Sequence, residues 1–215
     1  LKWAEAEKGR YIIEDDYDSE FRYKGKPIPA LQGYDRSGRV IYIGTFSKSI
    51  APAIRMSYMV LPRPVLELYR QRCGFINSTV SKVDQLILQK FIEDGYYERH
   101  LNKTRALYRS RHDTLLAELK EMNLDIRISG ENAGVHLLLH FRDGRKEEEL
   151  IHRAAEKGVK VYGLSEYYVN YDGGANANGR KDKAEETVIL LGYANMNEER
   201  IKEAAVLLSK AWRQE

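Results

Sequence analysis

The chain has 215 residues, a mass of 24.9 kDa and a formal net charge of +3. With 43% hydrophobic and 10% aromatic residues, it has enough apolar side chains to build a core, which excludes a wholly disordered chain. No apolar run approaches the roughly 20 residues that cross a bilayer, and the charged N-terminal segment lacks the apolar stretch of a signal peptide. The sequence therefore predicts no membrane association.

Cysteine content and charge balance narrow the class further. The one cysteine, Cys73, cannot form an internal disulfide, which favours a cytoplasmic protein, and a zinc site built on several cysteines is excluded. The 35 basic and 32 acidic residues nearly cancel, which argues against a strongly basic nucleic-acid surface. His136 and His140 share one face of a predicted strand, but packed or solvated histidines are a better interpretation than a metal site. We therefore expect no bound metal.

The first 62 residues predict a helix end and three strands. A helix that ends before Gly9 is followed by strands, of which the first two have the continuous apolar pattern of strands buried on both faces. These elements cover residues 1–8, 11–13, 40–43 and 56–61. The first strand leads into the acidic cluster 14–18, and ligands of parallel α/β sheets bind at such carboxyl ends of strands.

Helical spacing dominates from residue 63 to residue 120, and strands alternate with helices after that. The predicted helices are 64–73, 81–94, 97–120, 147–157 and 198–212, and the predicted strands are 125–128, 135–141, 159–162 and 187–193. The alternation predicts a small α/β domain with a mixed sheet. The segment 170–186 is rich in Gly, Asn and charge, which predicts a mobile surface loop. We place the domain boundary within or just before the long helix, and divide the chain into domains 1–96 and 97–215.

Lys48 is the most informative single residue. It follows the second strand, and a lysine at the mouth of a parallel sheet can be partly desolvated. Desolvation favours the neutral amine, which is nucleophilic enough to form a Schiff base with an aldehyde. A lone lysine in such a position is more often an ordinary surface residue, so the interpretation depends on its neighbours.

Five side chains near the same strand ends have complementary chemistry. Asp15 closes the first strand, and its carboxylate suits a protonated pyridine nitrogen, whose positive ring withdraws electrons from a substrate carbon. Tyr17 can donate a hydrogen bond to a phenolic oxygen of that ring, and Thr45, Ser47 and Arg55 have the donors for a phosphate. Each residue also has a bland alternative, such as a turn cap for Asp15, edge packing for Tyr17 or a surface ion pair for Arg55. Together the five favour one site.

Several segments resemble a known family. They are IIEDDYDSEFRY at 12–23, PIPALQ at 27–32, VIYIGTFSKSIAPAIRMSYMVLP at 40–62 and, more weakly, LLGYANMNEERI at 190–201. They are similar to the pyridoxal-phosphate domain of fold-type-I aminotransferases and, more narrowly, to the aminotransferase-like domain of MocR-type regulators in the GntR family. The resemblance implies an α/β fold that forms the C-terminal part of a fold-type-I transferase. That part comprises an incomplete large-domain sheet and a small α/β C-terminal domain.

The resemblance also implies pyridoxal 5′-phosphate as cofactor and a role for each candidate residue. Lys48 is implied as the catalytic lysine that forms the internal aldimine, with Asp15 on the pyridine nitrogen and Tyr17 on the ring hydroxyl. The implied phosphate ligands are Thr45, Ser47 and Arg55. A homodimer is implied too, with DNA binding only through an N-terminal winged helix-turn-helix domain that is absent from this chain.

The chain departs from the family pattern in two respects. We predict only three strands of the seven-stranded large-domain sheet, so the chain is interpreted as a C-terminal fragment with an exposed sheet edge. Some relatives place an arginine for a ligand carboxylate after the strand that matches 159–162, where this sequence aligns Glu166. A glutamate would repel a carboxylate and attract an amine. An alignment shift of one or two residues is the open alternative, and Arg180 is a candidate substitute.

Two functions use these residues. In the first, the chain is the effector-sensing domain of a MocR/GntR-type regulator, and a small amine-bearing or amino-acid-like effector displaces Lys48 to form an external aldimine. The new contacts then shift the arrangement of the domains. In the alternative, the chain belongs to a class I/II aminotransferase, and Lys48 also moves a proton between substrate and cofactor. A third interpretation is a structural fragment without bound cofactor. The sequence of residues 14–23 favours the regulator.

Overall fold

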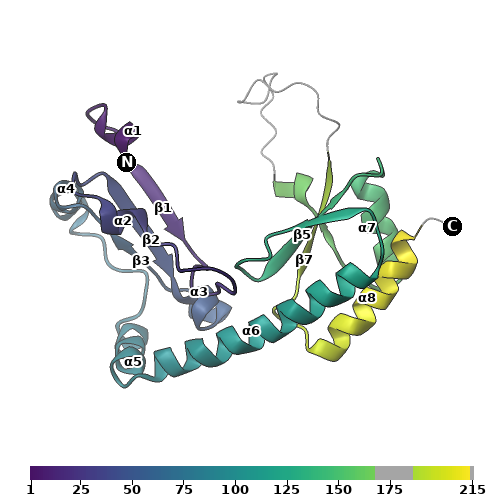
Figure 1. Ribbon diagram of the computed structural model, residues 1–215. Helices are drawn as coiled ribbons and strands as arrows, with labels where there is room; N and C mark the ends of the chain where they lie inside the picture. Colours follow the sequence, from purple (N-terminus) through teal and green to yellow (C-terminus); the bar gives the residue numbers. More distant parts are fainter. Residues whose placement is uncertain (168–185, 214–215) are drawn as a thin grey trace. The chain divides into compact units, whose positions relative to one another are not determined.

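The computed structural model describes residues 1–167 and 186–213, and the chain forms two compact units, Leu1–Arg105 and Ala106–Glu215 (Figure 1). Helix α6 (Tyr96–Glu121) runs from the first unit into the second. The domain boundary expected between residues 96 and 97 stays a prediction. Arg180 and, apart from residue 186, the loop expected at 170–186 lie outside the described residues.

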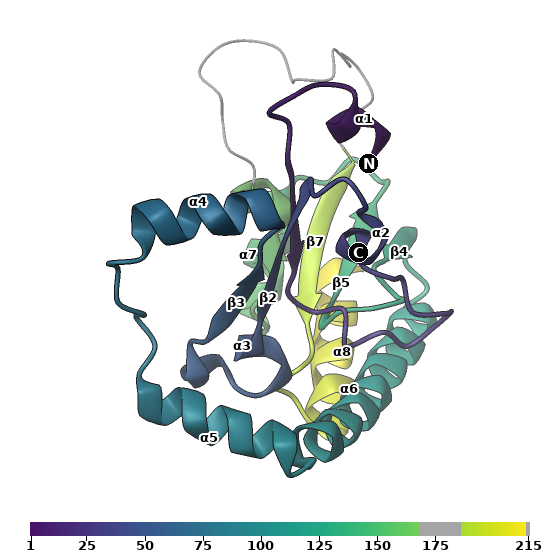
Figure 2. The ribbon, with the colours of Figure 1, turned by 90° about the vertical axis from the view of Figure 1, so that its left-hand side faces the viewer.

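The first unit carries the acidic cluster and Lys48 on a small sheet (Figures 1 and 2). Its elements are α1 (Lys2–Glu5), β1 (Ile12–Asp16), α2 (Leu31–Tyr34), β2 (Val40–Thr45), α3 (Phe46–Ser49), the 3-10 turn η1 (Pro52–Ile54), β3 (Ser57–Val60), α4 (Arg63–Cys73) and α5 (Lys82–Glu93). The strand order is β1-β2-β3, with β1 parallel and β3 antiparallel to β2. The three strands and the helices α4, α5 and α6 are confirmed as predicted.

Burial on both faces, which we expected at residues 11–13, is wrong. Among the described residues strand β1 pairs with β2 alone, and its burial alternates: Ile13 is 66% exposed while Ile12 is half-buried. The four residues of β3 are exposed as well. The reason is that the described residues add no further strand beside β1 or β3 and leave part of the sheet uncovered. The sheet therefore has the open edges of an incomplete large-domain sheet.

Glu14 ties the segment between β1 and β2 to the sheet. Its carboxylate accepts hydrogen bonds from the backbone N–H groups of Leu31 at 2.7 Å and Gln32 at 3.0 Å, at the start of α2. These bonds satisfy donors that a helix start leaves without intrahelical partners. Sequence analysis grouped Glu14 with the other acids of the cluster, but the structure gives it this local structural role.

The second unit holds a four-stranded sheet. Besides the end of α6, its elements are β4 (Ile126–Ser129), β5 (His136–Phe141), α7 (Glu147–Glu156), β6 (Tyr162–Gly163), the 3-10 turn η2 (Leu164–Tyr167), β7 (Thr187–Gly192) and α8 (Glu198–Trp212). The strand order is β4-β5-β7-β6, and each neighbouring pair is antiparallel. The mixed sheet that we expected is therefore wrong. Strands β5 and β6 do run in the same direction, but β7 lies between them and is antiparallel to both.

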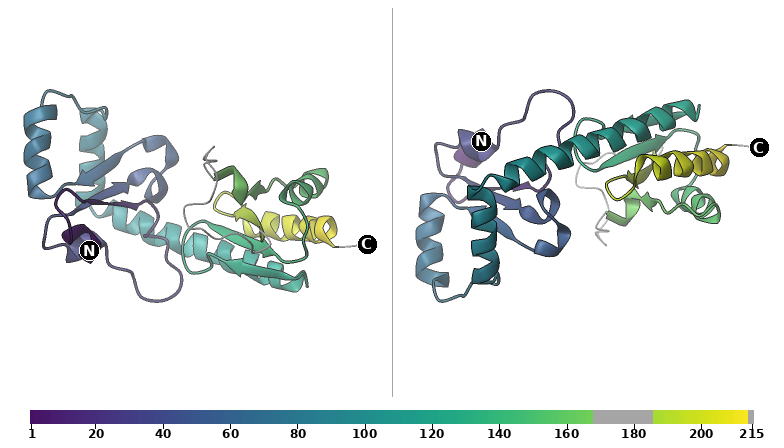
Figure 3. Two further views of the ribbon diagram at one scale, coloured as in Figure 1. Left: turned by 90° about the horizontal axis from the view of Figure 1, so that it is seen from above. Right: turned by 90° about the horizontal axis from the view of Figure 1, so that it is seen from below.

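One face of this sheet forms the core of the second unit. Along β5 the buried residues are Leu137, Leu139 and Phe141, whereas His136 and His140 point to the other face. Phe141 meets the fully buried Trp212 of α8 edge to face, with ring centroids 5.2 Å apart. Figure 3 shows α7 and α8 as neighbours in this unit. In the part of the chain that is described, no helix has the length and apolar character of a bilayer span.

Candidate functional site

The parallel pairing of β1 and β2 brings the predicted site residues to one edge of the sheet. Asp15 lies beside Ile43, and Tyr17 follows the end of β1. Lys48 follows the end of β2 directly, because α3 begins without an intervening loop (Figure 2). Groups 33 positions apart in the sequence, Asp15 and Lys48, therefore both lie at the carboxyl ends of adjacent parallel strands.

Thr45 starts the short helix that carries Ser47 and Lys48. Its hydroxyl accepts a hydrogen bond from the backbone N–H of Ser47 at 3.2 Å and donates one to the carbonyl oxygen of Met56 at 3.1 Å. The bond to Met56 links the end of β2 to the beginning of β3 and uses the one proton of the hydroxyl. The predicted phosphate role of Thr45 would therefore require this proton to turn away from Met56.

Arg55 has a left-handed backbone, with a φ of 46°. This conformation is uncommon for residues other than glycine, and its energetic cost must be offset by contacts of the surrounding structure. Arg55 lies between η1 and β3 and is exposed. It stands two residues before Ser57, and Ser57 is paired with Thr45 at the end of β2. The structure therefore brings Arg55 to the strand end that carries Thr45 and Lys48.

Three charged side chains at this edge have no partner within the described chain. The side chains of Asp15, Lys48 and Arg55 are exposed and form no hydrogen bond or ion pair with another described residue. Tyr17 is 43% exposed, and the pKa of its phenol is raised by the charge of Asp18, then by burial and by the charge of Asp15. The phenol thus stays protonated and can donate. One amine, one guanidinium, one carboxylate and one phenol are available to a ligand.

Sequence reasoning missed two tyrosines beside this edge. Tyr42 donates a hydrogen bond to Asp16 Oδ2 at 2.8 Å, and its ring lies 6.1 Å from the ring of Tyr58. The pKa of Tyr42 is raised strongly, first by burial and then by its hydrogen bond to Asp16. The alternation of VIYIGT could have placed Tyr42 on one face with Gly44, but the pairing with Asp16 depends on register.

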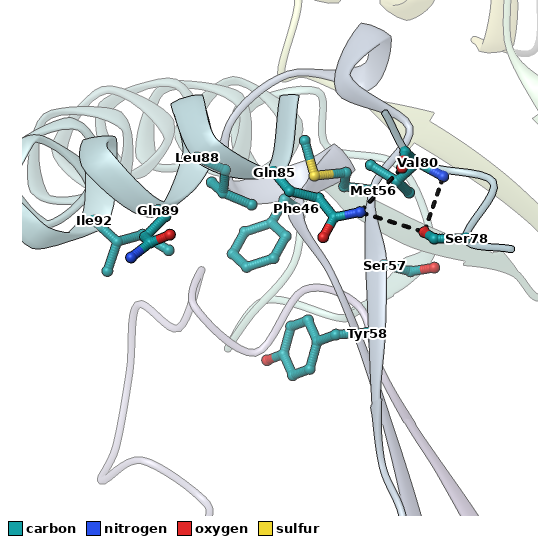
Figure 4. A pocket seen from close by; sticks show the side chains of 10 residues that line it. All are labelled: Phe46, Met56, Ser57, Tyr58, Ser78, Val80, Gln85, Leu88, Gln89 and Ile92. Carbon is teal, nitrogen blue, oxygen red and sulfur yellow. Dashed lines mark hydrogen bonds between the residues drawn. The ribbon is translucent and has the colours of Figure 1, made fainter. Parts of the chain in front are cut away.

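The first unit also contains a largely apolar pocket of about 330 Å³ between β3 and α5 (Figure 4). Its lining residues are Phe46, Met56, Ser57, Tyr58, Ser78, Val80, Gln85, Leu88, Gln89 and Ile92. Gln85 is held in the wall by a hydrogen bond from its amide to the carbonyl oxygen of Val80 at 3.0 Å. None of the predicted site residues lines this pocket, so the candidate site is the strand edge and not this cavity.

Glu166, the candidate effector contact, lies in η2 of the second unit and is exposed. The same turn is anchored by Glu147, whose carboxylate accepts hydrogen bonds from the backbone N–H and the hydroxyl of Ser165. The role of Glu166 as an effector contact stays a prediction. Among the described residues no cluster of potential metal ligands is found.

The sequence of the chain matches a known protein family. Residues 5–207 match the family Aminotransferase class I and II, and the chain belongs to that family. It is 42% identical to the uncharacterized HTH-type transcriptional regulator YhdI of Bacillus subtilis over 213 residues, which are 99% of this chain and 43% of YhdI. The probable rhizopine catabolism regulatory protein MocR of Rhizobium meliloti is 32% identical, over 94% of this chain and 39% of MocR. The similarity to MocR-type regulators is thus confirmed.

Solved aminotransferases have the same fold. Kynurenine aminotransferase of Pyrococcus horikoshii, in complex with PMP, gives a TM-score of 0.77 at 25% identity, over 94% of this chain and 47% of the enzyme. The multiple substrate aminotransferase of Thermococcus profundus gives 0.78 at 27% identity, with the same coverage. The chain thus spans less than half the length of these relatives. The predicted fold, the C-terminal part of a fold-type-I transferase, is confirmed.

These comparisons support pyridoxal 5′-phosphate as the cofactor, and the groups at the strand edge fit it. The unpaired amine of Lys48 suits the aldehyde, the unpaired carboxylate of Asp15 suits the ring nitrogen, and the guanidinium of Arg55 suits the phosphate. These individual roles stay predictions.

Proposed function

We propose that the chain is the cofactor-binding, effector-sensing part of a MocR/GntR-type transcription regulator. The observation that carries the proposal is the gathering of the unpaired Lys48, Asp15 and Arg55 at the ends of β1, β2 and η1. The 42% identity to HTH-type regulators over 99% of the chain favours a regulator over an enzyme.

In this proposal each group has a defined task. Lys48 Nζ would hold the aldehyde group of pyridoxal phosphate, with loss of water, and the amino group of an effector would compete with Lys48 for the same group. Asp15 accepts a hydrogen bond from the ring nitrogen, and Tyr17 donates one to the ring hydroxyl. Ser47, Thr45 and Arg55 hold the phosphate, with Arg55 as the charged ligand. When bound, the cofactor supplies an aldehyde that exchanges one amine for another.

The effector of the proposed regulator is a small molecule with an amino group. Glu166 supports this class, because a carboxylate attracts an ammonium group and repels a carboxylate. Arg180, outside the described residues, is a second candidate contact. We further propose a cytoplasmic homodimer that binds DNA through an N-terminal domain outside this chain. Exchange of the amine on the cofactor changes contacts between domains and so shifts their equilibrium.

A class I/II aminotransferase is the second candidate function. The observation that favours it is the similarity to enzymes, such as the aromatic-amino-acid aminotransferase 1 of Thermococcus litoralis at 27% identity over 95% of this chain. Both functions require the same attachment of the cofactor, but only the enzyme converts an amino acid to an oxo acid. Incubation of the protein with amino acids and 2-oxoglutarate, with detection of glutamate, separates the two.

Borohydride reduction tests the shared step. The protein at its natural length is incubated with pyridoxal phosphate, reduced and weighed by mass spectrometry. We expect one reduced cofactor per chain, lost in Lys48→Ala and kept in the control Lys90→Ala, which removes an exposed lysine of α5. A labelled Lys48→Ala protein would refute the assignment. An unlabelled natural protein would refute the proposal that this chain binds pyridoxal phosphate.

A further inference from the structure

The two faces of β1 hold their acids in different ways. In the parallel register, Glu14 and Asp16 lie beside Tyr42 and Gly44 and share one face of the sheet, whereas Asp15 lies beside Ile43 on the other. Glu14 is fixed by α2, and Asp16 is fixed by the hydroxyl of Tyr42 at 2.8 Å. Only Asp15 is left without a hydrogen bond among the described residues.

A row of aromatic rings continues from Tyr42 to the helix that carries Lys48. The ring of Tyr58 lies 6.1 Å from Tyr42 and 5.4 Å from Phe46, the first residue of α3. Figure 4 shows the Tyr58 and Phe46 side chains near each other. Tyr58 can lie across β2 because the residue beside it is Gly44, where a Cβ would come within 2.5 Å of the Tyr58 hydroxyl. Asp16, Tyr42, Tyr58 and Phe46 therefore form one connected row from the end of β1 to α3.

We propose that Tyr42 is a positioning residue for the cofactor site: by holding Asp16 it fixes the carboxyl end of β1 and, through it, the place of Asp15 relative to Lys48. The inference rests on the proposed function. Adjacent residues of a strand share one backbone, so a clamp on Asp16 limits the motion of its neighbour Asp15. The strong rise in the pKa of Tyr42, caused first by burial and then by the hydrogen bond to Asp16, means that its hydroxyl keeps its proton and can donate to Asp16.

Tyr42→Phe tests the clamp with the smallest change, because it removes one hydroxyl and keeps the ring that packs on Tyr58. The matched control is Tyr69→Phe, on α4, because Tyr69 is an exposed residue whose hydroxyl makes no hydrogen bond within the described chain. Asp16→Ala removes the other partner, and the double variant Tyr42→Phe/Asp16→Ala completes a cycle. All are made in the protein at its natural length and titrated with pyridoxal phosphate.

We expect Tyr42→Phe to raise the dissociation constant of pyridoxal phosphate about 3- to 10-fold, the loss of one net hydrogen bond. It also shifts upward the pH midpoint of the visible absorption band of the bound cofactor. If Asp15 is less well placed, it stabilises less positive charge on the ring. The ring then repels the protonated nitrogen at Lys48 less, and the pKa of that nitrogen rises. Asp16→Ala should act in the same direction, and the double variant should add little to either single change.

Amide hydrogen exchange of Ile12–Asp16 in the cofactor-free protein gives a readout that does not depend on the proposed function. We expect faster exchange there in Tyr42→Phe and no change in Tyr69→Phe. Unchanged exchange would overturn the inference even if the natural protein binds no cofactor. A higher dissociation constant without a shift of the pH midpoint would also overturn it, because Tyr42 would then be only a packing residue. If Lys48→Ala loses the cofactor as expected and Tyr42→Phe changes nothing, the proposed function stands and the inference about Tyr42 is overturned.

Discussion

At Gly44 the addition of a single methyl group would displace the ring of Tyr58. A Cβ there would lie 2.5 Å from Tyr58 Oη and 2.7 Å from Tyr58 Cε1, and nearer still to Cζ. Carbon atoms pack at about 3.5–4.0 Å, so the rigid ring must move by about 1 Å or swing out toward solvent. Either movement breaks the contacts of Tyr58 with Tyr42 and Phe46.

Gly44→Ala should therefore lower the free energy of unfolding by about 1–2 kcal/mol. Overpacking costs about 1–3 kcal/mol, and removing a flexible glycine from a strand returns about 0.5–1 kcal/mol of that. Urea unfolding followed by far-UV circular dichroism measures the difference. The matched control is Gly33→Ala in α2, where a Cβ meets nothing within 4 Å and φ is not positive. It should be neutral or slightly stabilising.

The same substitution in a Tyr58→Ala variant shows whether the Tyr58 ring causes the loss of stability. In Tyr58→Ala the ring is gone, so the further change Gly44→Ala should cost much less than in the natural protein, with a coupling of about 1 kcal/mol or more. The reasoning is refuted if Gly44→Ala is no more costly than Gly33→Ala. It is equally refuted if the cost persists unchanged without the Tyr58 ring.

Two further predictions concern stability. Asp35 accepts hydrogen bonds from the backbone N–H groups of Val40 and Arg39; burial alone would raise its pKa, but these bonds outweigh burial and lower it. A lowered pKa means that the stabilisation is present above the unfolded pKa of about 3.9 and is lost as pH falls through the folded pKa. Asp35→Asn should therefore lower the urea midpoint at pH 7 and lower it less as the pH falls below the unfolded pKa; an equal effect at pH 7 and at pH 3 would contradict it. In the second unit, Trp212→Ala should cost about 3–5 kcal/mol in urea unfolding, because it leaves a cavity beside Phe141. A loss below about 1 kcal/mol would show that this core can collapse.

Local patterns in the sequence were sufficient to predict most helices and strands. Helix α8 runs over Glu198–Trp212 as predicted, because Asn197 accepts a hydrogen bond from the backbone N–H of Arg200 and caps its start. The strands β2 and β3 were recognisable from short apolar runs bounded by Gly and Pro. The placement of Lys48 just after a strand followed from the same pattern. Such features depend on residues within a few positions of each other.

The tertiary structure alone decided which strands are neighbours and which faces are covered. Strand β7 lies between β5 and β6, so the small sheet is antiparallel and not mixed, and Ile13 is exposed because nothing in the described chain covers its face of β1. The hydrogen bond of Tyr42 to Asp16 joins residues 26 positions apart, and it requires the register that sets Asp16 beside Gly44. Residue order specifies the local periodicity of a strand, but pairing and burial are settled only when distant segments compete to cover the same apolar surface.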